Sequence, residues 1–535
     1  MNNASVAYYP EIRTLGDVPR VHGRIRGERP ALRFENRLTS YSEFDQRTAQ
    51  VANGLAAEGL TQGSRVAFLG RNSDLFFEVV FGALRLGAVV VPLNWRLAPP
   101  ELRTILVDAE AEVLFVAPEC DVLADSLRET AGTCRTISMA PRPSEEHYSA
   151  WRDRQSAADR PTPGGADDVA IQLYTSGTTG RPKGVQLTHS ALYAFNERAA
   201  ERPAEFGADL DWICWTAEDV SLVALPCFHI SGCGWGIASL YAGAMTVVLA
   251  EFTNEGVIDA IRRFGVSKTV LVPTTIEMMV DDPGLTQADL ISMRHYLYGA
   301  APMPPALMAR ALATFDCGLV QLYGLTETCG AVTYLPPQDH VPGGARLRSA
   351  GKPLPGVEVR IVDPASNLEV PVGAVGEICL KTPAMMQGYW RQVDETRRVL
   401  DGEGWLRSGD AGRLDADGYL YISDRVKDMI VTGGENVYPV EVEAAIYGHP
   451  DVAEVAVIGV PHPKWGEAVK ALVVPRAGCM PAPETILAYA RERIAGYKLP
   501  KSIDFVDGLP RNATGKVLKR ELRAAYWAGH ERLVS

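Results

Sequence analysis

The sequence predicts an α/β protein with a large N-terminal domain of helix-covered mixed sheets, a small β-barrel-like subdomain and a small α+β domain at the C-terminal end. Three observations support this fold class. The opening third alternates helical and strand-like segments, a pattern typical of parallel sheets covered by helices. After about Gly351 the chain changes to short strands and turns, and from Arg425 a compact mixture of helices and strands follows. We therefore expect one domain over residues 1–424, with its β-rich part at about 350–424, and a second over residues 425–535.

The first elements follow from the hydrophobic periodicity of the opening third. Leu38–Leu60 has the period of a helix, with Ser42 and Glu43 near its start and Gly59 near its end. A strand, a helix and a second strand are expected next, over Arg65–Gly70, Phe76–Gly87 and Ala88–Asn94. The polar, proline-rich passage 141–168 then reads as a connector.

The sequence pattern changes after about Gly351. Short strands separated by turns are expected within Gly351–Asp363, Gly376–Lys381 and Gly418–Ser423. The C-terminal part is expected to contain two helices, within Pro439–His449 and Glu484–Gly496, and two strands, over Val452–Val460 and Val469–Pro475. The charged stretch Asp424–Asp428 between these parts fits a hinge and a plain linker equally well.

Composition excludes several classes of protein. Of the 535 residues, 47% are hydrophobic and 22% charged, which is ordinary for a globular protein. No apolar run approaches the ~18 residues of a spanning helix, so no integral membrane segment is expected. The N-terminus has no basic start followed by an apolar stretch, so we expect no signal peptide. The net charge of −12 disfavours a nucleic-acid partner.

The nine cysteines are scattered, without a CxxC pair or metal-ligand spacing. We expect buried free thiols and a cytoplasmic location.

The segment Tyr174–Gly184, with the sequence YTSGTTGRPKG, is the strongest functional signal. It lies between a strand-like run and a segment that reads as a strand turning into a helix. Its glycines allow backbone N–H groups to approach an anion, and its hydroxyls and one lysine add donors and a positive charge. It is not a P-loop, because Pro182 precedes Lys183. The segment therefore predicts a polyphosphate site.

A second signal is Tyr323–Gly330, with the sequence YGLTETCG. Thr326 can donate to a phosphate, and the adjacent carboxylate of Glu327 is a hard ligand suited to Mg²⁺. A surface turn is the alternative reading of this segment taken alone.

Together with segments near residues 229, 299, 410, 433 and 516, and in the same order, these motifs resemble the adenylate-forming (AMP-binding) superfamily. That superfamily includes acyl-CoA synthetases, amino-acid adenylation domains and firefly-type luciferases, and the resemblance covers nearly the whole chain. It implies that the C-terminal domain is a mobile lid.

The resemblance implies binding of ATP with Mg²⁺ and assigns a role to each matching residue. Catalytic roles fall to Lys183, Thr326, Glu327 and Lys516, and metal binding to Glu327 and Ser176. The implied ATP and AMP contacts are Thr175, Ser176, Gly177, Thr178, Thr179, Gly180, Lys183, Gly299, Ala300, Ala301, Tyr323, Gly324, Thr326, Asp410, Arg425 and Lys516. Lys516 is matched to the lid lysine that neutralises charge during adenylation.

The acid and thiol sites are implied in the same way. The acyl pocket is matched to His229, Ile230, Gly232, Trp235, Gly299 and Gly324, with His229 as a positioning group rather than a base. Gly433, Gly434 and Glu435 are matched to the loop that lines the CoA tunnel, and Lys427 to the hinge.

These assignments predict an ATP-dependent, AMP-forming acyl-CoA ligase. Glycines at 232, 234 and 236 suggest an apolar pocket with room, which favours a medium- or long-chain fatty acid or a bulky alicyclic acid. An aryl acid is the second choice. Three other functions are less favoured: a stand-alone adenylation domain, a luciferase-like enzyme and a non-catalytic nucleotide-binding protein. The sequence is also compatible with a homodimer. Trp212 and Trp215, in the aromatic segment Glu201–Val220, would either roof the acyl entrance or pack on the surface.

Overall fold

A computed structural model describes residues 6–128, 134–141, 147–176, 182–216, 218–301, 303–425, 428–432, 435–511 and 517–528. The chain divides into two compact units. The first comprises Met1–Leu347, Gly351–Glu358 and Lys381–Trp405, and the second Arg348–Ala350, Val359–Leu380 and Leu406–Ser535. The second unit includes most of the β-rich part, and the expected boundary at residue 424 stays a prediction.

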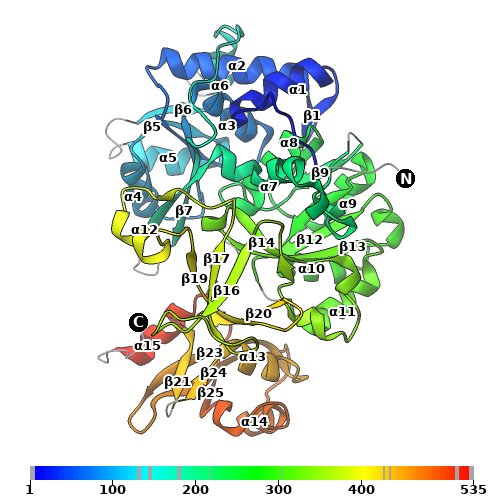
Figure 1. Ribbon diagram of the computed structural model, residues 1–535, viewed down its shortest axis with the longest axis vertical. Helices are drawn as coiled ribbons and strands as arrows, with labels where there is room; N and C mark the ends of the chain where they lie inside the picture. The colour runs from blue at the N-terminus through cyan, green and yellow to red at the C-terminus, as the bar shows by residue number, and fades with distance from the viewer. Residues whose placement is uncertain are drawn as a thin grey trace. The chain divides into compact units, whose positions relative to one another are not determined.

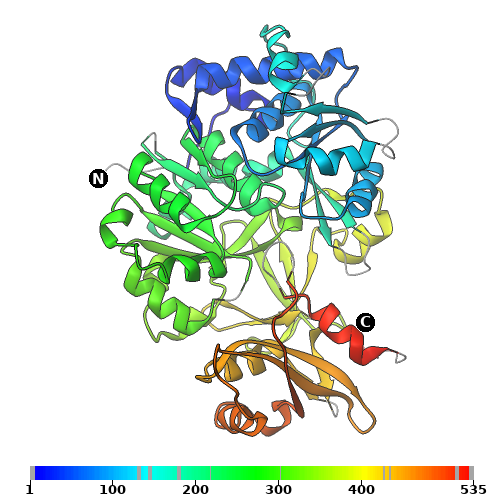
Figure 2. The same ribbon diagram turned by 180° about the vertical axis from the view of Figure 1, so that it is seen from behind.

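The first unit contains a nine-stranded sheet whose central strands are parallel. Its strands, in spatial order, are β15 (Lys352–Pro353), β14 (Gly330–Leu335), β13 (Gly318–Leu325), β12 (His295–Gly299), β11 (Lys268–Leu271), β9 (Val220–Val223), β10 (Met245–Val248), β1 (Pro30–Phe34) and β2 (Arg37–Ser40). Apolar residues of β9 to β13 form one core with α9 (Asn254–Phe264), α10 (Pro273–Val280) and α11 (Pro305–Thr314). Figure 2 shows these green helices beside the sheet.

A seven-stranded sheet completes the strand framework of this unit. Its order is β18 (Gly388–Tyr389), β8 (Pro182–Thr188), β7 (Val169–Ser176), β4 (Val89–Leu93), β3 (Arg65–Leu69), β5 (Ala111–Val116) and β6 (Arg135–Ser138). The other helices of the unit are α1 (Val18–Arg26), α2 (Tyr41–Ala57), α3 (Asp74–Leu86), α4 (Pro99–Ala109), α5 (Asp121–Arg128), α6 (Tyr148–Asp153), α7 (His189–Glu201), α8 (Ile230–Ala242) and α12 (Val393–Val399) (Figure 1). The predicted strand–helix–strand unit is confirmed as β3–α3–β4, with β3 and β4 parallel.

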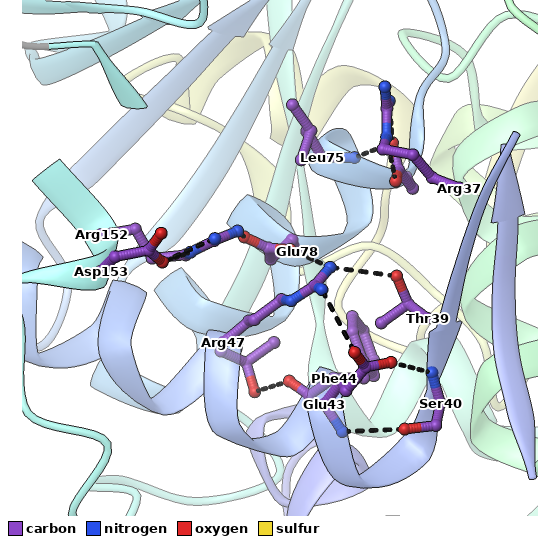
Figure 3. A network of polar contacts seen from close by, with 12 residues as sticks. Arg37, Thr39, Ser40, Glu43, Phe44, Arg47, Leu75, Glu78, Arg152 and Asp153 are labelled. Atoms are coloured by element: carbon purple, nitrogen blue, oxygen red, sulfur yellow. Dashed lines mark hydrogen bonds and ion pairs between the residues drawn. The ribbon is translucent and has the colours of Figure 1, made fainter. Parts of the chain in front are cut away.

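Helix α2 begins at Tyr41, close to Ser42 and Glu43, which were expected near its start. Ser40 is the N-cap: its hydroxyl accepts the backbone N–H of Glu43, and the Glu43 carboxylate accepts the N–H of Ser40. Figure 3 shows this capping box together with Arg47, which contacts Thr39 and Glu43.

The proline-rich connector is more structured than its composition suggests, because it contains α6. Tyr148 and Trp151 of this helix are fully buried. Arg152 and the Tyr148 hydroxyl both donate to Glu78 of α3, at 2.7 and 2.6 Å (Figure 3 shows the arginine contact). The helix therefore fastens the connector to α3.

The second unit contains two sheets. The β-rich part forms a four-stranded sheet, β16 (Glu358–Val362), β17 (Gly376–Lys381), β19 (Leu406–Leu414) and β20 (Leu420–Arg425). The predicted α+β tail contains β22 (Glu435–Val437), β21 (Ile430–Thr432), β24 (Gly466–Pro475), β23 (Val452–His462) and β25 (Ser502–Phe505), with α13 (Pro439–Tyr447), α14 (Pro483–Arg491) and α15 (Lys519–Trp527). In the described part of the chain, no helix has the length and hydropathy needed to cross a bilayer.

Candidate active site

Three of the predicted segments of the first unit lie at one edge of the nine-stranded sheet. The parallel strand β12 ends at Gly299 and is followed by Ala300 and Ala301, and β13 is followed by Thr326 and Glu327. His229 lies six residues after the end of β9. In open α/β sheets the edge formed by the carboxyl ends of parallel strands is where ligands bind. Topology therefore gathers segments that are nearly 100 residues apart in the sequence.

The predicted phosphate loop joins the antiparallel strands β7 and β8. Thr175 at the end of β7 is paired with Lys183 at the start of β8. Gly177, Thr178, Thr179 and Gly180 lie outside the described residues, and of Ser176 only the backbone is described. The structure thus frames the loop with a hairpin.

Lys183 is a buried cation whose charge is paired. Its Nζ lies 2.7 Å from Oε2 of Glu395 and 4.9 Å from the centre of the Tyr389 ring. Only 8% of Lys183 is exposed. The hydrogen bond from Lys183 lowers the pKa of Glu395, so this carboxylate is ionised at neutral pH.

Glu327 lies in the short 3₁₀ turn Thr326–Thr328 that follows β13. Its Oε1 accepts a hydrogen bond from the Tyr389 hydroxyl at 2.9 Å, and its backbone carbonyl accepts the N–H of Met386 at 2.8 Å. Burial, followed by the neighbouring Glu327 charge, raises the pKa of Tyr389, which therefore stays a proton donor. Tyr389 connects two residues, Lys183 and Glu327, that the sequence predicted separately.

The residue described at the predicted metal position is the carboxylate Glu327. Among the residues that the structure describes, no group of three or more His, Cys, Asp or Glu side chains is arranged to hold a metal. One hard carboxylate oxygen is what Mg²⁺ needs when its other ligands are waters and phosphate oxygens. Glu327 therefore fits a nucleotide-bound Mg²⁺ rather than a metal enclosed by protein ligands.

The strand ends at Gly299 and Gly324 exclude any larger residue. A Cβ at Gly324 would overlap the carbonyl oxygen of Gly330, and one at Gly299 would overlap that of Leu322. Ala300, which follows Gly299, has a φ of 66°, a conformation uncommon for a residue with a side chain. Strained backbone of this kind is concentrated at functional sites.

His229 is a neutral group at the start of α8. Burial, reinforced by the charge of Arg96, lowers the pKa of His229 to about 4. Its Nε2 is buried and has no hydrogen-bond partner among the described residues. Burial also raises the pKa of the nearby thiols of Cys227, Cys233 and Cys329. His229 and these three thiols are therefore uncharged at neutral pH, and the charge that acts on His229 is the cation of Arg96.

Gly232 and Gly236 of α8 do not provide the room expected from the sequence. A side chain at Gly232 would overlap the carbonyl oxygens of Leu225 and Pro226, and one at Gly236 would overlap the ring of Phe77. The space at Gly234 is bounded by Ile230, 2.9 Å from the Cβ position. Gly232 and Gly236 therefore permit close packing inside the protein, so the inference of room from these two glycines was wrong.

The tryptophans of Glu201–Val220 are buried rather than packed on the surface. Trp212 and Trp215 are 5% and 9% exposed. The Trp215 ring lies 5.2 Å from that of Trp235, and the buried Nζ of Lys268 lies 4.7 Å from the Trp215 ring centre. Trp235, one of the predicted acyl-pocket residues, thus packs against this segment.

The second unit carries the remaining predicted residues. Asp410 lies in β19, is 5% exposed, and is paired in register with Arg425 of β20, of which only the backbone is described. Glu435 begins β22 and is likewise described only as backbone. Lys427, Gly433, Gly434 and Lys516, to which the sequence predicted hinge, tunnel and lid roles, lie outside the described residues.

The sequence motifs missed Tyr389 and Glu395. Both lie more than 200 residues after Lys183, in β18 and α12, and β18 reaches the site by pairing with β8. The aromatic pair Tyr389–Trp390 after Gly388 is the one local signal, and it is weak because aromatic residues after glycine are common in cores.

Comparisons with known proteins give a family match over most of the chain. Residues 20–390 match the model of the AMP-binding enzyme family, and residues 441–516 match the model of its C-terminal domain. The fatty acid–[acyl-carrier-protein] ligase ScoC of Streptomyces coeruleorubidus is 39% identical, with 99% of each chain covered. The feruloyl-CoA synthase of an Amycolatopsis species is 38% identical, covering 96% of this chain and 99% of its own. ATP-bound MatB from Rhodopseudomonas palustris has a TM-score of 0.85 at 33% identity, covering 97% of this chain and 100% of its own.

Proposed function

Because the chain belongs to the AMP-binding enzyme family, we propose that it joins a hydrophobic carboxylic acid to the thiol of CoA through an acyl-adenylate. The observation that carries this proposal is the arrangement at Tyr389, which links the carboxylate of Glu327 to the cation of the phosphate loop, Lys183. A carboxylate that can bind a metal and a loop that can bind phosphates, in one cluster, are suited to binding a nucleotide and its phosphates together.

In the first step, a carboxylate oxygen of the acid attacks the α-phosphorus of ATP. A new O–P bond forms, the bond to the β-phosphate oxygen breaks, and pyrophosphate leaves with the electron pair. Residues Thr175–Gly180 hold the departing phosphates, Thr326 donates to the α-phosphate, and Tyr323 packs on adenine. Mg²⁺, held by Glu327 and Ser176, would neutralise phosphate charge. Lys516 stabilises the charge that develops on phosphorus.

In the second step, the sulfur of the thiol attacks the carbonyl carbon of the adenylate. The C–S bond forms, the C–O bond to AMP breaks, AMP leaves with the electron pair, and the thiol proton is released. We propose that the C-terminal domain turns about Lys427 between the steps, which removes Lys516 and brings Gly433–Glu435 to the thiol path. Asp410 and Arg425 hold the ribose.

The acid is proposed to lack an ammonium group. The imidazole of His229 is neutral and the three nearby thiols are protonated, and the charge that acts on His229 is the cation of Arg96. An ammonium would lose its hydration there without a partner. Fatty acids are the first candidates, because ScoC is 39% identical, and aryl acids the second, because the feruloyl-CoA synthase is 38% identical.

An acyl-carrier protein is the alternative thiol. The name of ScoC, whose full length this chain matches, specifies such an acceptor. Pyrophosphate release with a panel of fatty acids, benzoates and cinnamates tests the first step, and thioester formation with CoA or with a holo-acyl-carrier protein tests the second. Thioester formed on the carrier protein alone would replace CoA in the proposal, and no pyrophosphate from any acid would refute it.

All nine cysteines are free thiols, which supports a reducing compartment, the cytoplasm.

A further inference from the structure

Residues Gly388–Val399 touch both functional motifs of the first unit, although neither motif includes them. We propose that Tyr389 is a positioning residue that fixes the carboxylate of Glu327 for the nucleotide-bound metal and couples it to Lys183. This role rests on the proposed adenylation reaction.

The backbone holds Tyr389 in one place. It lies in β18 and is paired with Val185 of β8. Val185 follows Lys183 by two residues. Its N–H donates to Oγ1 of Thr396 at 2.9 Å, and that hydroxyl donates to the carbonyl of Gln392 at 2.9 Å. The pairing with β8 and the hydrogen bonds to the start of α12 thus fix the position of the Tyr389 backbone, from which the side chain extends.

The phenol direction follows from its partner. The Tyr389 O–H donates to Oε1 of Glu327, so the hydroxyl points to that carboxylate oxygen. Tyr389 is only 8% exposed, which limits competition from water for this bond. With one oxygen held, the carboxylate presents its other lone pairs in a fixed direction. Groups that hold a metal ligand in this way typically contribute about 10- to 100-fold to metal affinity.

The face of the same ring receives Lys183. The Lys183 Nζ lies 4.9 Å from the ring centre and is held by Glu395 at 2.7 Å. Glu395 also pairs with Arg398 of α12. Lys183 therefore anchors the C-terminal end of the phosphate loop to β18 and α12. Displacing the ring would disturb both the metal carboxylate and the loop.

The test is the variant Tyr389→Phe, which removes the hydroxyl and keeps the ring over Lys183. Mn²⁺ replaces Mg²⁺ as a spectroscopic probe, and its binding to the protein with ATP is titrated by electron paramagnetic resonance, without acid or thiol. We expect the Mn²⁺ dissociation constant to rise about tenfold. ATP affinity without metal is expected to stay within twofold of the native value.

Tyr334→Phe is the matched control. The Tyr334 hydroxyl donates to Oδ2 of Asp209 at 2.5 Å, also a partly buried tyrosine–carboxylate bond, but outside the motifs above. Its loss should leave Mn²⁺ affinity unchanged. An equal effect of both variants, or a change below twofold in Tyr389→Phe, would overturn the proposal.

A double-mutant cycle identifies the route of the effect. If Tyr389 acts through Glu327, then Tyr389→Phe should change Mn²⁺ affinity less than threefold in a Glu327→Gln background. An undiminished tenfold effect there would contradict the proposed coupling. The titration needs no turnover, so native protein that binds Mn²⁺ and ATP but releases no pyrophosphate would refute the proposed function, while the titration still tests whether Tyr389 holds Glu327 for the metal.

Discussion

The ring of Phe77 in α3 occupies the space that a side chain at Gly236 of α8 would need. Two helices more than 150 residues apart in the sequence therefore depend on a missing Cβ for their contact. From the sequence alone, Gly236 can be interpreted as leaving room for a ligand. In the structure, the fully buried Phe77 fills that space.

This packing predicts that Gly236→Ala affects stability and leaves substrate choice unchanged. Forcing a methyl group against Phe77 should lower the free energy of unfolding by about 1–3 kcal/mol. Denaturant titration measures the loss, and the acid panel measures the preference. Gly165→Ala is the control, because nothing lies within 4 Å of its Cβ position. Unchanged stability with a shifted acid preference would restore the pocket interpretation.

Replacement of Lys516 should separate the two half-reactions. In Lys516→Ala, adenylate formation is expected to fall by about 10²–10³-fold, because one preorganised donor to the transition state is lost. Thioester formation from presynthesised acyl-AMP should change less than threefold. Pyrophosphate release and thioester assays measure the two steps separately. Comparable losses in both would exclude an exchange of the lid between the steps.

Asp410 offers a test of ribose binding. Asp410→Ala should raise the dissociation constant of ATP about tenfold, because a carboxylate that accepts two ribose hydroxyl protons typically contributes charge-assisted hydrogen bonds of about 1.5–3 kcal/mol. Calorimetric titration with ATP measures this, and thermal unfolding checks that the variant keeps its fold. An unchanged ATP dissociation constant in a folded variant would remove the ribose role.

Buried histidines should make the protein less stable in mild acid. Burial lowers the pKa of His22 and His189 to about 4, from 6.5. Protonation therefore favours the unfolded chain, so this stability is complete above pH 6.5 and is lost as the pH falls towards 4. Nδ1 of His189 accepts the N–H of Leu15 at 3.1 Å, so protonation there breaks a hydrogen bond.

Denaturant titrations between pH 4 and 7 measure this slope. His189→Asn keeps an acceptor near the Nδ1 position but does not titrate, so the slope should decrease by about one proton, roughly 1.4 kcal/mol per pH unit. An identical slope in this variant would mean that His189 takes up no proton on unfolding.

Local sequence patterns predicted the helices and strands of the fold well. They could not predict how segments far apart in the sequence pack together. The alternation from Arg65 to Asn94 led directly to β3, α3 and β4, because periodicity reports which face is buried. Ser42 and Glu43 do lie near the start of α2, and the hydrogen bonds show that Ser40 is its N-cap.

In the candidate site, too, the separate motifs could be predicted from the sequence, but the contact between them could not. Glu327 and Lys183 could be predicted because each lies in a short motif whose residue types suit phosphate chemistry. Their connection could not, because it passes through Tyr389 and depends on the pairing of β18 with β8. Gly232 and Gly236 of α8 were misread because a missing side chain marks close approach without revealing what approaches.

The pairing of the first strand has a consequence for synthesis on the ribosome. β1 is parallel to β10, and the register runs from Leu32 with Thr246 to Phe34 with Val248. Until residue 248 has been made, β1 has only the hairpin with β2, and an isolated hairpin is marginally stable in water. About 210 residues must therefore emerge before the N-terminal strand gains its parallel partner. Translation pauses or chaperone binding within that interval should affect the yield of folded protein more than similar events after β10.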